Sequence, residues 1–205
     1  VNGCPWDKVQ THTSIRMNFL EEAYEAVDAL DLDDPVLMCE ELGDVLMQVA
    51  FHTCMEQETG RFTWEQVCDG VCQKLIERHP NIFGTQPGYE GITDWDALKN
   101  KEKGRRTLAD DLESVPRAMP ALMRAAKLQK RAARHGAALQ GADAAALVDA
   151  AENLQTAQPA SAQAEQAVGE LLFAAANLAR QAGVDPEQAL QKANEAFCTA
   201  AGPVA

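Results

Sequence analysis

The segment between residues 36 and 55 constrains the fold more than any other part of this 205-residue chain. At about 100° per residue, its apolar side chains surround most of a helix and leave one narrow polar stripe. The stripe consists of Glu41, Asp44, Gln48 and His52. A helix that is apolar on nearly every side is usually buried. The sequence therefore predicts an enclosed helix whose carboxylates point into the protein.

Two acidic signatures, Glu22-x-x-Glu25 and Glu41-x-x-Asp44, fall in two successive predicted helices. Residues three or four apart are neighbours on a helix, so each signature places two carboxylates on one face. A tight turn between the helices would bring all four together. Their mutual repulsion favours a bound cation, and carboxylate oxygens suit Mg²⁺ or Mn²⁺. This pattern favours phosphate chemistry, with a solvated helix surface as the competing interpretation for the first signature.

The earlier of these two helices is predicted over residues 13–30. Its predicted core face consists of Ile15, Phe19, Ala23, Val27 and Leu30. Glu22 lies at the margin of that face, and Glu25 lies one step further outward.

Charge and cysteine content restrict the class of protein. The net charge of −13 argues against general nucleic-acid binding, which needs a basic surface. Residues 1–60 hold 13 acidic and 2 basic side chains, whereas residues 99–135 hold 4 acidic and 11 basic ones. We interpret the basic stretch as a solvated helix, with contact to phosphate or RNA as the less favoured alternative. The six cysteines lack the CxxC spacing of a metal site, and we expect no secretory signal at the start of the sequence. The charged stripe argues against a membrane span at residues 36–55. These features predict a cytoplasmic protein with reduced cysteines.

Helical patterns account for most of the rest of the chain. Further helices are predicted at 63–78, 120–136, 162–182 and 186–200, with a short one near 95–103 in an otherwise loop-like stretch, 81–115. Residues 155–161 are predicted to form a flexible joint. The tail also repeats the head, because Gly43-Asp-Val-Leu46 matches Gly169-Glu-Leu-Leu172. The repeated copy has lost its acidic pattern, since Ala167 replaces Glu41, so it is predicted to be a scaffold without a second site.

Four motifs resemble one known family. They are Gly3-Cys-Pro-Trp-Asp-Lys-Val-Gln-Thr-His12, Leu20-Glu-Glu-Ala-Tyr-Glu25, Glu40-Glu-Leu-Gly-Asp44 and Lys74-Leu-Ile-Glu-Arg-His-Pro80. Together they closely resemble MazG, a nucleoside triphosphate pyrophosphohydrolase family of the all-α pyrophosphatase superfamily. The resemblance implies an all-α fold of tandem helical repeats, a homodimer, and Mg²⁺-dependent cleavage of NTPs and dNTPs to monophosphate and pyrophosphate. It places a first repeat at 1–84, a loop and basic connecting helix at 85–135, and a degenerate second repeat at 136–205.

The resemblance also implies roles for individual residues. The metal ligands of the family carry over to Glu22, Glu25, Glu41 and Asp44, with Glu21 or Glu25 as acceptor of the proton of the attacking water. Lys74 and Arg78 occupy the positions of phosphate-binding cations. Trp6, His12 and Gln48 are further candidates for shaping the nucleotide pocket, although Trp6 could equally cap the core. Because the second repeat has lost its acids, activity is expected in the first.

Two other classes remain open at this point. A di-iron or di-manganese helix-bundle protein also uses inward carboxylates, but it typically adds Glu-x-x-His pairs, which this sequence lacks. A catalytically impaired protein that binds nucleotide or a partner without turnover is the other alternative.

Overall fold

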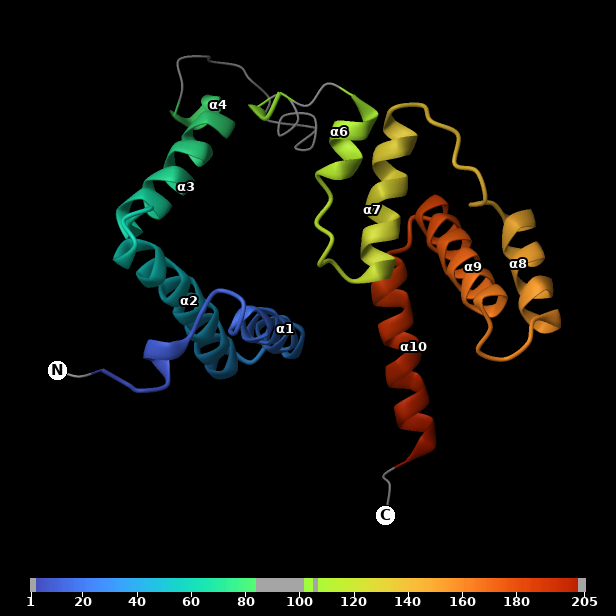
Figure 1. The fold of residues 1–205 in the computed structure, drawn as a ribbon, viewed down its shortest axis with the longest axis horizontal. Helices are drawn as coiled ribbons and strands as arrows, with labels where there is room; N and C mark the ends of the chain where they lie inside the picture. Colours follow the sequence, from blue (N-terminus) through green and yellow to red (C-terminus); the bar gives the residue numbers. More distant parts are fainter. Residues whose placement is uncertain (1–2, 84–101, 105–106, 203–205) are drawn as a thin grey trace. The chain divides into compact units, whose positions relative to one another are not determined.

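The structure is a computed structural model that describes residues 3–83, 102–104 and 107–202. The residues it describes form helices and turns and no strand, which confirms the predicted all-α class. Contacts divide the chain into two compact units, residues 1–93 and residues 94–205. Each unit contains a closely packed pair of helices (Figure 1). The short helix predicted near 95–103 falls mainly outside the described residues.

The N-terminal unit is built on the helix pair α1 and α2. Its elements are a short 3-10 helix η1 (Asp7–Val9), α1 (Arg16–Leu32), α2 (Pro35–Glu58), α3 (Trp64–Arg78) and α4 (Pro80–Phe83). Asp33 ends α1 in the left-handed conformation, with φ 54°, and the chain reverses there. The two helices therefore run side by side with almost no connecting loop (Figure 1).

Side-chain caps fix where α2 and α3 begin. The Oδ1 of Asp34 accepts hydrogen bonds from the backbone N–H groups of Val36 and Leu37, at 2.9 and 3.2 Å. Pro35 follows as the first residue of α2, where a missing N–H costs nothing. At α3, Thr63 and Gln66 form a capping box, in which each side chain bonds to the backbone N–H of the other residue.

The predicted core face of α1 is partly wrong. Ala26 and Ala29 are buried against α2, whereas Val27 and Leu30 are about half exposed. The small alanine side chains let the backbones of the two helices approach closely, so α1 is rotated from the predicted orientation. Its buried face contains Glu22, which lies one turn before Ala26.

The prediction of an enclosed α2 is also wrong for the single chain. Its side chains at Leu42, Leu46 and Met47 are 53%, 56% and 44% exposed. Only one side of α2 is covered by α1, and α3 contributes no buried residue of its own. Three large apolar side chains of α2 therefore stay exposed in the single chain.

The C-terminal unit consists of α6 (Leu108–Glu113), α7 (Ala121–Arg134), α8 (Ala144–Thr156), α9 (Ala162–Gln181) and α10 (Pro186–Ala201). Helices α8 and α9 form its packed pair, and α7 lies against α9. The predicted helices at 120–136, 162–182 and 186–200 correspond to α7, α9 and α10. Sequence patterns missed α4 and α6, which interrupt the predicted loop, and left α8 unassigned. Both α6 and α8 nevertheless carry N-caps, at Thr107 and Asp143.

A buried ion pair ties α6 to α7 in this unit. Asp111 is 1% exposed, and its carboxylate lies 3.0 Å from Arg131, 3.4 Å from Arg134 and 3.2 Å from His135. The apolar core of this unit is rich in alanine, including Ala150, which suits close packing of helices. Among the described residues, no helix combines the length and the apolar character that crossing a membrane requires.

Candidate metal centre

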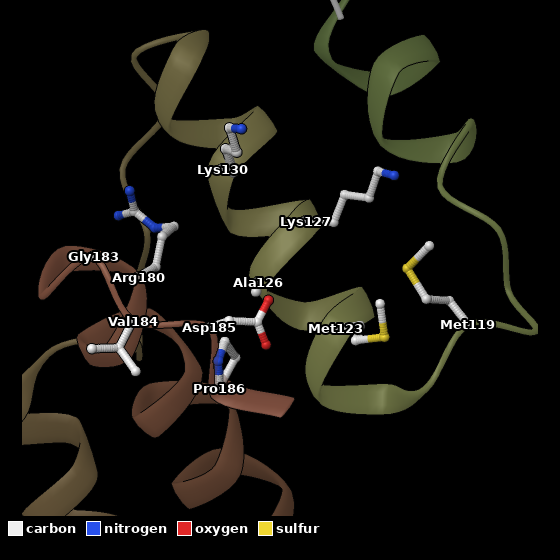
Figure 2. A pocket seen from close by; sticks show the side chains of 10 residues that line it. All are labelled: Met119, Met123, Ala126, Lys127, Lys130, Arg180, Gly183, Val184, Asp185 and Pro186. Carbon is white, nitrogen blue, oxygen red and sulfur yellow. The ribbon is translucent and has the colours of Figure 1, made fainter. Parts of the chain in front are cut away.

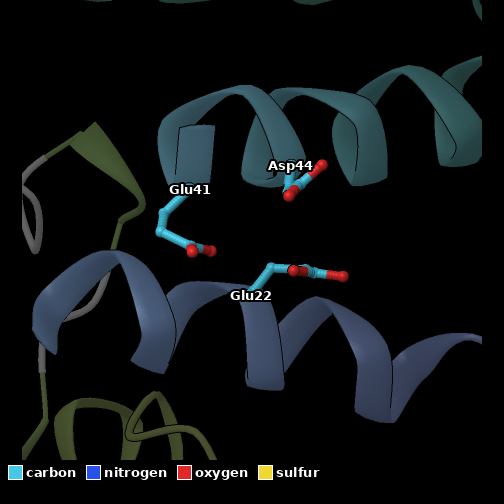
Figure 3. A group of neighbouring side chains, drawn as sticks. All are labelled: Glu22, Glu41 and Asp44. Atoms are coloured by element: carbon cyan, nitrogen blue, oxygen red, sulfur yellow. The ribbon is translucent and has the colours of Figure 1, made fainter. Parts of the chain in front are cut away.

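Three carboxylates from α1 and α2 converge across the helix pair. Glu22 of α1 faces Glu41 and Asp44 of α2 (Figure 3). One ligand oxygen of each lies within 4.8 Å of the others, and all three side chains are partly buried. Among the residues that the structure describes, this is the only group of three or more His, Cys, Asp or Glu side chains close enough to share an ion. We refer to Glu22, Glu41 and Asp44 as the acid trio.

Local helix geometry accounts for this convergence. Glu41 and Asp44 are three residues apart and therefore share one face of α2. The short turn at Asp33 and Asp34 holds α1 against that face. Since the buried face of α1 includes Glu22, its carboxylate is directed at α2 and not at solvent.

Glu25 and Glu21, also on α1, lie outside the trio and are exposed. Desolvation by burial raises the pKa of Glu25, and the nearby negative charges, chiefly that of Glu41, raise it further. Desolvation likewise raises the pKa of Glu41, with the charge of Glu40 as the next cause and those of Asp44 and Glu22 after it. The site thus disfavours its own negative charges in the absence of a cation.

The donor set fits a hard divalent cation. All three groups offer carboxylate oxygens, which are the ligands that Mg²⁺ and Mn²⁺ prefer. A metal ion there would offset both causes that raise the pKa of Glu41, which are desolvation first and then the repulsion between the carboxylates. His52, the nearest histidine along the stripe of α2, instead contacts His12 and Phe19. The carboxylate–histidine ligation of a di-iron bundle therefore has no support at the trio.

Gln48 lies next to the trio on the buried side of α2. Only 6% of its surface is exposed, and its Nε2 donates a long hydrogen bond of 3.4 Å to Oε1 of Glu22. The amide is thus placed to orient Glu22. Its predicted part in shaping the nucleotide pocket stays a prediction.

His12 belongs to a second polar cluster further along the helix pair. Its Nδ1 shares a 2.7 Å hydrogen bond with Nδ1 of His52, and the two rings stack with centroids 5.0 Å apart. Its Nε2 lies 2.5 Å from Glu56, which also pairs with Arg61 at 2.6 Å. Burial first, and then the charge of His12, lowers the pKa of His52.

Sequence reasoning missed Glu56 and Arg61, although a signal for Glu56 was present. It follows His52 by four residues and so continues the polar stripe of α2 by one turn. Trp6 lies near the same end of the helix pair, where its ring meets Phe51 edge-on at a centroid distance of 6.3 Å. Trp6 is still 55% exposed, so it leaves a large aromatic surface available.

Lys74 and Arg78 lie one turn apart near the end of α3, Lys74 exposed and Arg78 partly so. Helix α3 leads away from the α1–α2 pair instead of folding back along it (Figure 1). Within one chain the structure therefore does not bring these two cations to the acid trio.

Comparison with known proteins connects this geometry to a family. Residues 10–83 match the family described as the MazG nucleotide pyrophosphohydrolase domain. A nucleoside triphosphate pyrophosphohydrolase of Escherichia coli strain K12 is 41% identical over 207 residues, which cover 96% of this chain and 78% of that protein. The chain belongs to the MazG family.

Two further relatives extend this comparison. The nucleoside triphosphate pyrophosphohydrolase/pyrophosphatase MazG of Thermotoga maritima is 39% identical, over 95% of this chain and 76% of that protein. A nucleoside triphosphate pyrophosphohydrolase of Mycobacterium tuberculosis is 38% identical over 64% of this chain and 41% of its own length. The matched MazG domain contains the whole acid trio as well as Lys74 and Arg78, whereas Trp6 lies before it.

Proposed function

We propose that this chain hydrolyses nucleoside triphosphates, NTPs or dNTPs, to nucleoside monophosphate and pyrophosphate at the acid trio. Membership of the MazG family supports the reaction, which makes the chain a hydrolase acting on acid anhydrides. The observation that carries the assignment of residues is the convergence of three carboxylates within 4.8 Å in the matched domain. The N-terminal unit would thus perform the chemistry.

Glu22, Glu41 and Asp44 would hold Mg²⁺, or Mn²⁺ in its place. Such an ion, when bound, neutralises triphosphate oxygens and lowers the pKa of a coordinated water. Glu25 is the fourth carboxylate that the family pattern assigns to the metal, and it is exposed beside the trio. Its exposure leaves room for it to complete the ligand set or, like Glu21, to accept the proton of the attacking water.

Other residues of the chain would bind and orient the substrate. Gln48 holds Glu22 through its hydrogen bond and so keeps one metal ligand in place. His12 is fixed between His52 and Glu56, and the exposed face of Trp6 offers an aromatic surface for a base. We propose that Gln48, His12 and Trp6 shape the nucleotide pocket, and that Gln48 does so by orienting Glu22.

A homodimer would complete this site. Leu42, Leu46 and Met47 leave an apolar face of α2 uncovered, and a second copy would bury it. The same second copy could bring its Lys74 and Arg78 to the acid trio, because α3 carries them away from the trio of its own chain. These cations would then neutralise phosphate oxygens.

Product analysis tests the reaction. Purified full chain is incubated with a panel of NTPs and dNTPs, with Mg²⁺, with Mn²⁺ or with EDTA, and monophosphate, pyrophosphate and inorganic phosphate are measured separately. We expect equal amounts of monophosphate and pyrophosphate with either metal and none with EDTA. Release of single phosphates, or turnover that persists in EDTA, would contradict the proposal.

Mixing two inactive variants tests the shared site. Glu41→Gln lacks a metal ligand and Lys74→Ala lacks a phosphate-binding cation, so each should be inactive alone. If the trio of one chain works with the cations of another, random re-pairing restores about a quarter of the wild-type sites. A mixture that stays as inactive as its components, although both variants form dimers by sedimentation, would show that each site uses a single chain.

A further inference from the structure

The C-terminal unit contains a second concave site that the reaction at the acid trio does not use. A cavity of about 640 Å³ lies between α7 and the turn that joins α9 to α10 (Figure 2). This volume is in the range of small-molecule sites, about 300–1,000 Å³. Every residue that lines it lies between Met119 and Pro186, so it belongs to this unit alone.

The cavity is positively charged in a chain that is strongly acidic. Lys127 and Lys130 of α7 and Arg180 of α9 line it, against a single carboxylate, that of Asp185. The Oδ1 of Asp185 is already engaged, because it accepts hydrogen bonds from two backbone N–H groups at the start of α10. Three cations in a chain with a net charge of −13 indicate that an anion is the natural ligand here.

Arg180 is held in place by a neutral partner. Its Nε and Nη2 donate to Oδ1 of Asn177, at 3.0 and 2.8 Å. Asn177 is only 2% exposed, and its own Nδ2 donates to the backbone carbonyl of Ala142 at 2.5 Å. A carboxylate partner would have cancelled the charge of Arg180, whereas an amide orients the guanidinium and leaves its full charge for a ligand.

The two methionines of the cavity lie on one side of it. Met119 and Met123 are on the opposite side from Arg180 and Val184 in Figure 2, and the side chain of Lys127 extends toward the methionines. Methionine side chains adapt to flat or irregular surfaces and contact aromatic rings favourably. The ligand that uses the whole cavity therefore combines an anionic group with an aromatic or apolar body.

We propose that this cavity binds a nucleotide, with its phosphates at Lys130 and Arg180 and its base against Met119 and Met123. Such binding needs no metal ion, because cationic side chains and not carboxylates would receive the phosphates. The site is thus distinguished from the acid trio by its ligand chemistry. It would allow a substrate, a product or a related nucleotide to bind the C-terminal unit without being hydrolysed there.

Titration calorimetry in EDTA tests this site by itself. ADP and, separately, pyrophosphate are titrated into full chain, where the acid trio without metal repels both ligands. We expect saturable binding of one ADP per chain, weaker binding of pyrophosphate, and about a tenfold loss of ADP affinity in Lys130→Gln, since one charge-assisted hydrogen bond is removed. Lys192→Gln on α10, which removes the same charge from outside the cavity, should bind ADP like the wild type.

A second variant, Arg180→Gln, should weaken ADP binding to a similar degree, and a thermal melt shows whether its fold is retained. Absence of ADP binding in EDTA, or equal affinity in Lys130→Gln and Lys192→Gln, would overturn the proposal. Pyrophosphate binding as tight as that of ADP would overturn its nucleoside part. Pyrophosphohydrolase activity is a separate measurement with Mg²⁺, so failure of one proposal is distinguishable from failure of the other.

Discussion

Replacement of Glu41 by glutamine is the most direct test of the acid trio. The substitution keeps the length of the side chain and one carbonyl oxygen, but it lowers the number of carboxylates at the trio from three to two. Because the side chain is only partly buried on α2 and glutamine has nearly the same size as glutamate, the helix should form as before. The expected defect is therefore in metal binding and not in folding.

The expected loss of rate can be estimated from the charge stabilisation that a bound metal ion provides. A bound divalent ion stabilises developing charge on phosphate oxygens by several kcal/mol, and about 1.4 kcal/mol corresponds to a tenfold change in rate. We therefore expect Glu41→Gln to slow pyrophosphate release by about 10²–10³-fold at a Mg²⁺ concentration that saturates the wild type. Initial rates of pyrophosphate release, measured across a Mg²⁺ series, give this ratio.

A neighbouring residue supplies the matched control. Glu40→Gln removes the same charge from the adjacent, exposed position, which is outside the trio. It should retain activity within a few-fold of wild type. Added Mg²⁺ or Mn²⁺ should raise the melting temperature of the wild type and of Glu40→Gln but not of Glu41→Gln, because a ligand stabilises only the state that binds it. Full turnover in Glu41→Gln, or equal losses in both variants, would refute the assignment.

Three other predictions concern stability and the C-terminal unit. The pKa of Glu41 is raised in the folded state, so deprotonation of this carboxyl costs more in the folded chain than in the unfolded one. In EDTA, the wild type should therefore lose stability relative to Glu41→Gln as pH rises above about 4.5. Urea midpoints of the two proteins that differ by the same amount at every pH would contradict this. Asp111→Asn should destabilise the fold by about 3–5 kcal/mol, because it leaves the buried charge of Arg131 without its pair. Exposed Asp149→Asn is its control, and equal urea midpoints for the two variants would show that the ion pair is dispensable. Glu170→Gln, at the position that corresponds to Asp44 in the repeated copy, should leave pyrophosphate release unchanged, and a large loss would place chemistry in the second half.

Local sequence signals predicted most of the helices of the described residues. Asp34 before Pro35 and the capping box at Thr63 act through neighbours in the chain, so their outcome depends little on distant contacts. Helix α6 was missed because its six residues give too short a periodic pattern to read against a loop-like background. The family motifs also located the acidic positions, since they depend on residue identity and spacing alone.

Packing could not be predicted to the same degree. The pattern of apolar residues on α1 allows several rotations about the helix axis, and the largest side chains suggested the wrong one. Close approach at Ala26 and Ala29 selects the actual rotation, which directs Glu22 at α2 and leaves Val27 in solvent. Periodicity also could not show that α2 stays uncovered, because exposure depends on which other surfaces are present.

Residue identity and spacing by themselves determined the helical class of this protein, the ends of its main helices and the presence of paired acids on two successive helices. Only tertiary structure decided that Glu22 lies within 4.8 Å of Glu41 and Asp44 across the helix pair, and that a cationic cavity forms around Arg180 in the C-terminal unit. The physical reason is that helix periodicity relates side chains within one helix, whereas the distance between side chains on different helices depends on how closely and at what rotation the helices pack.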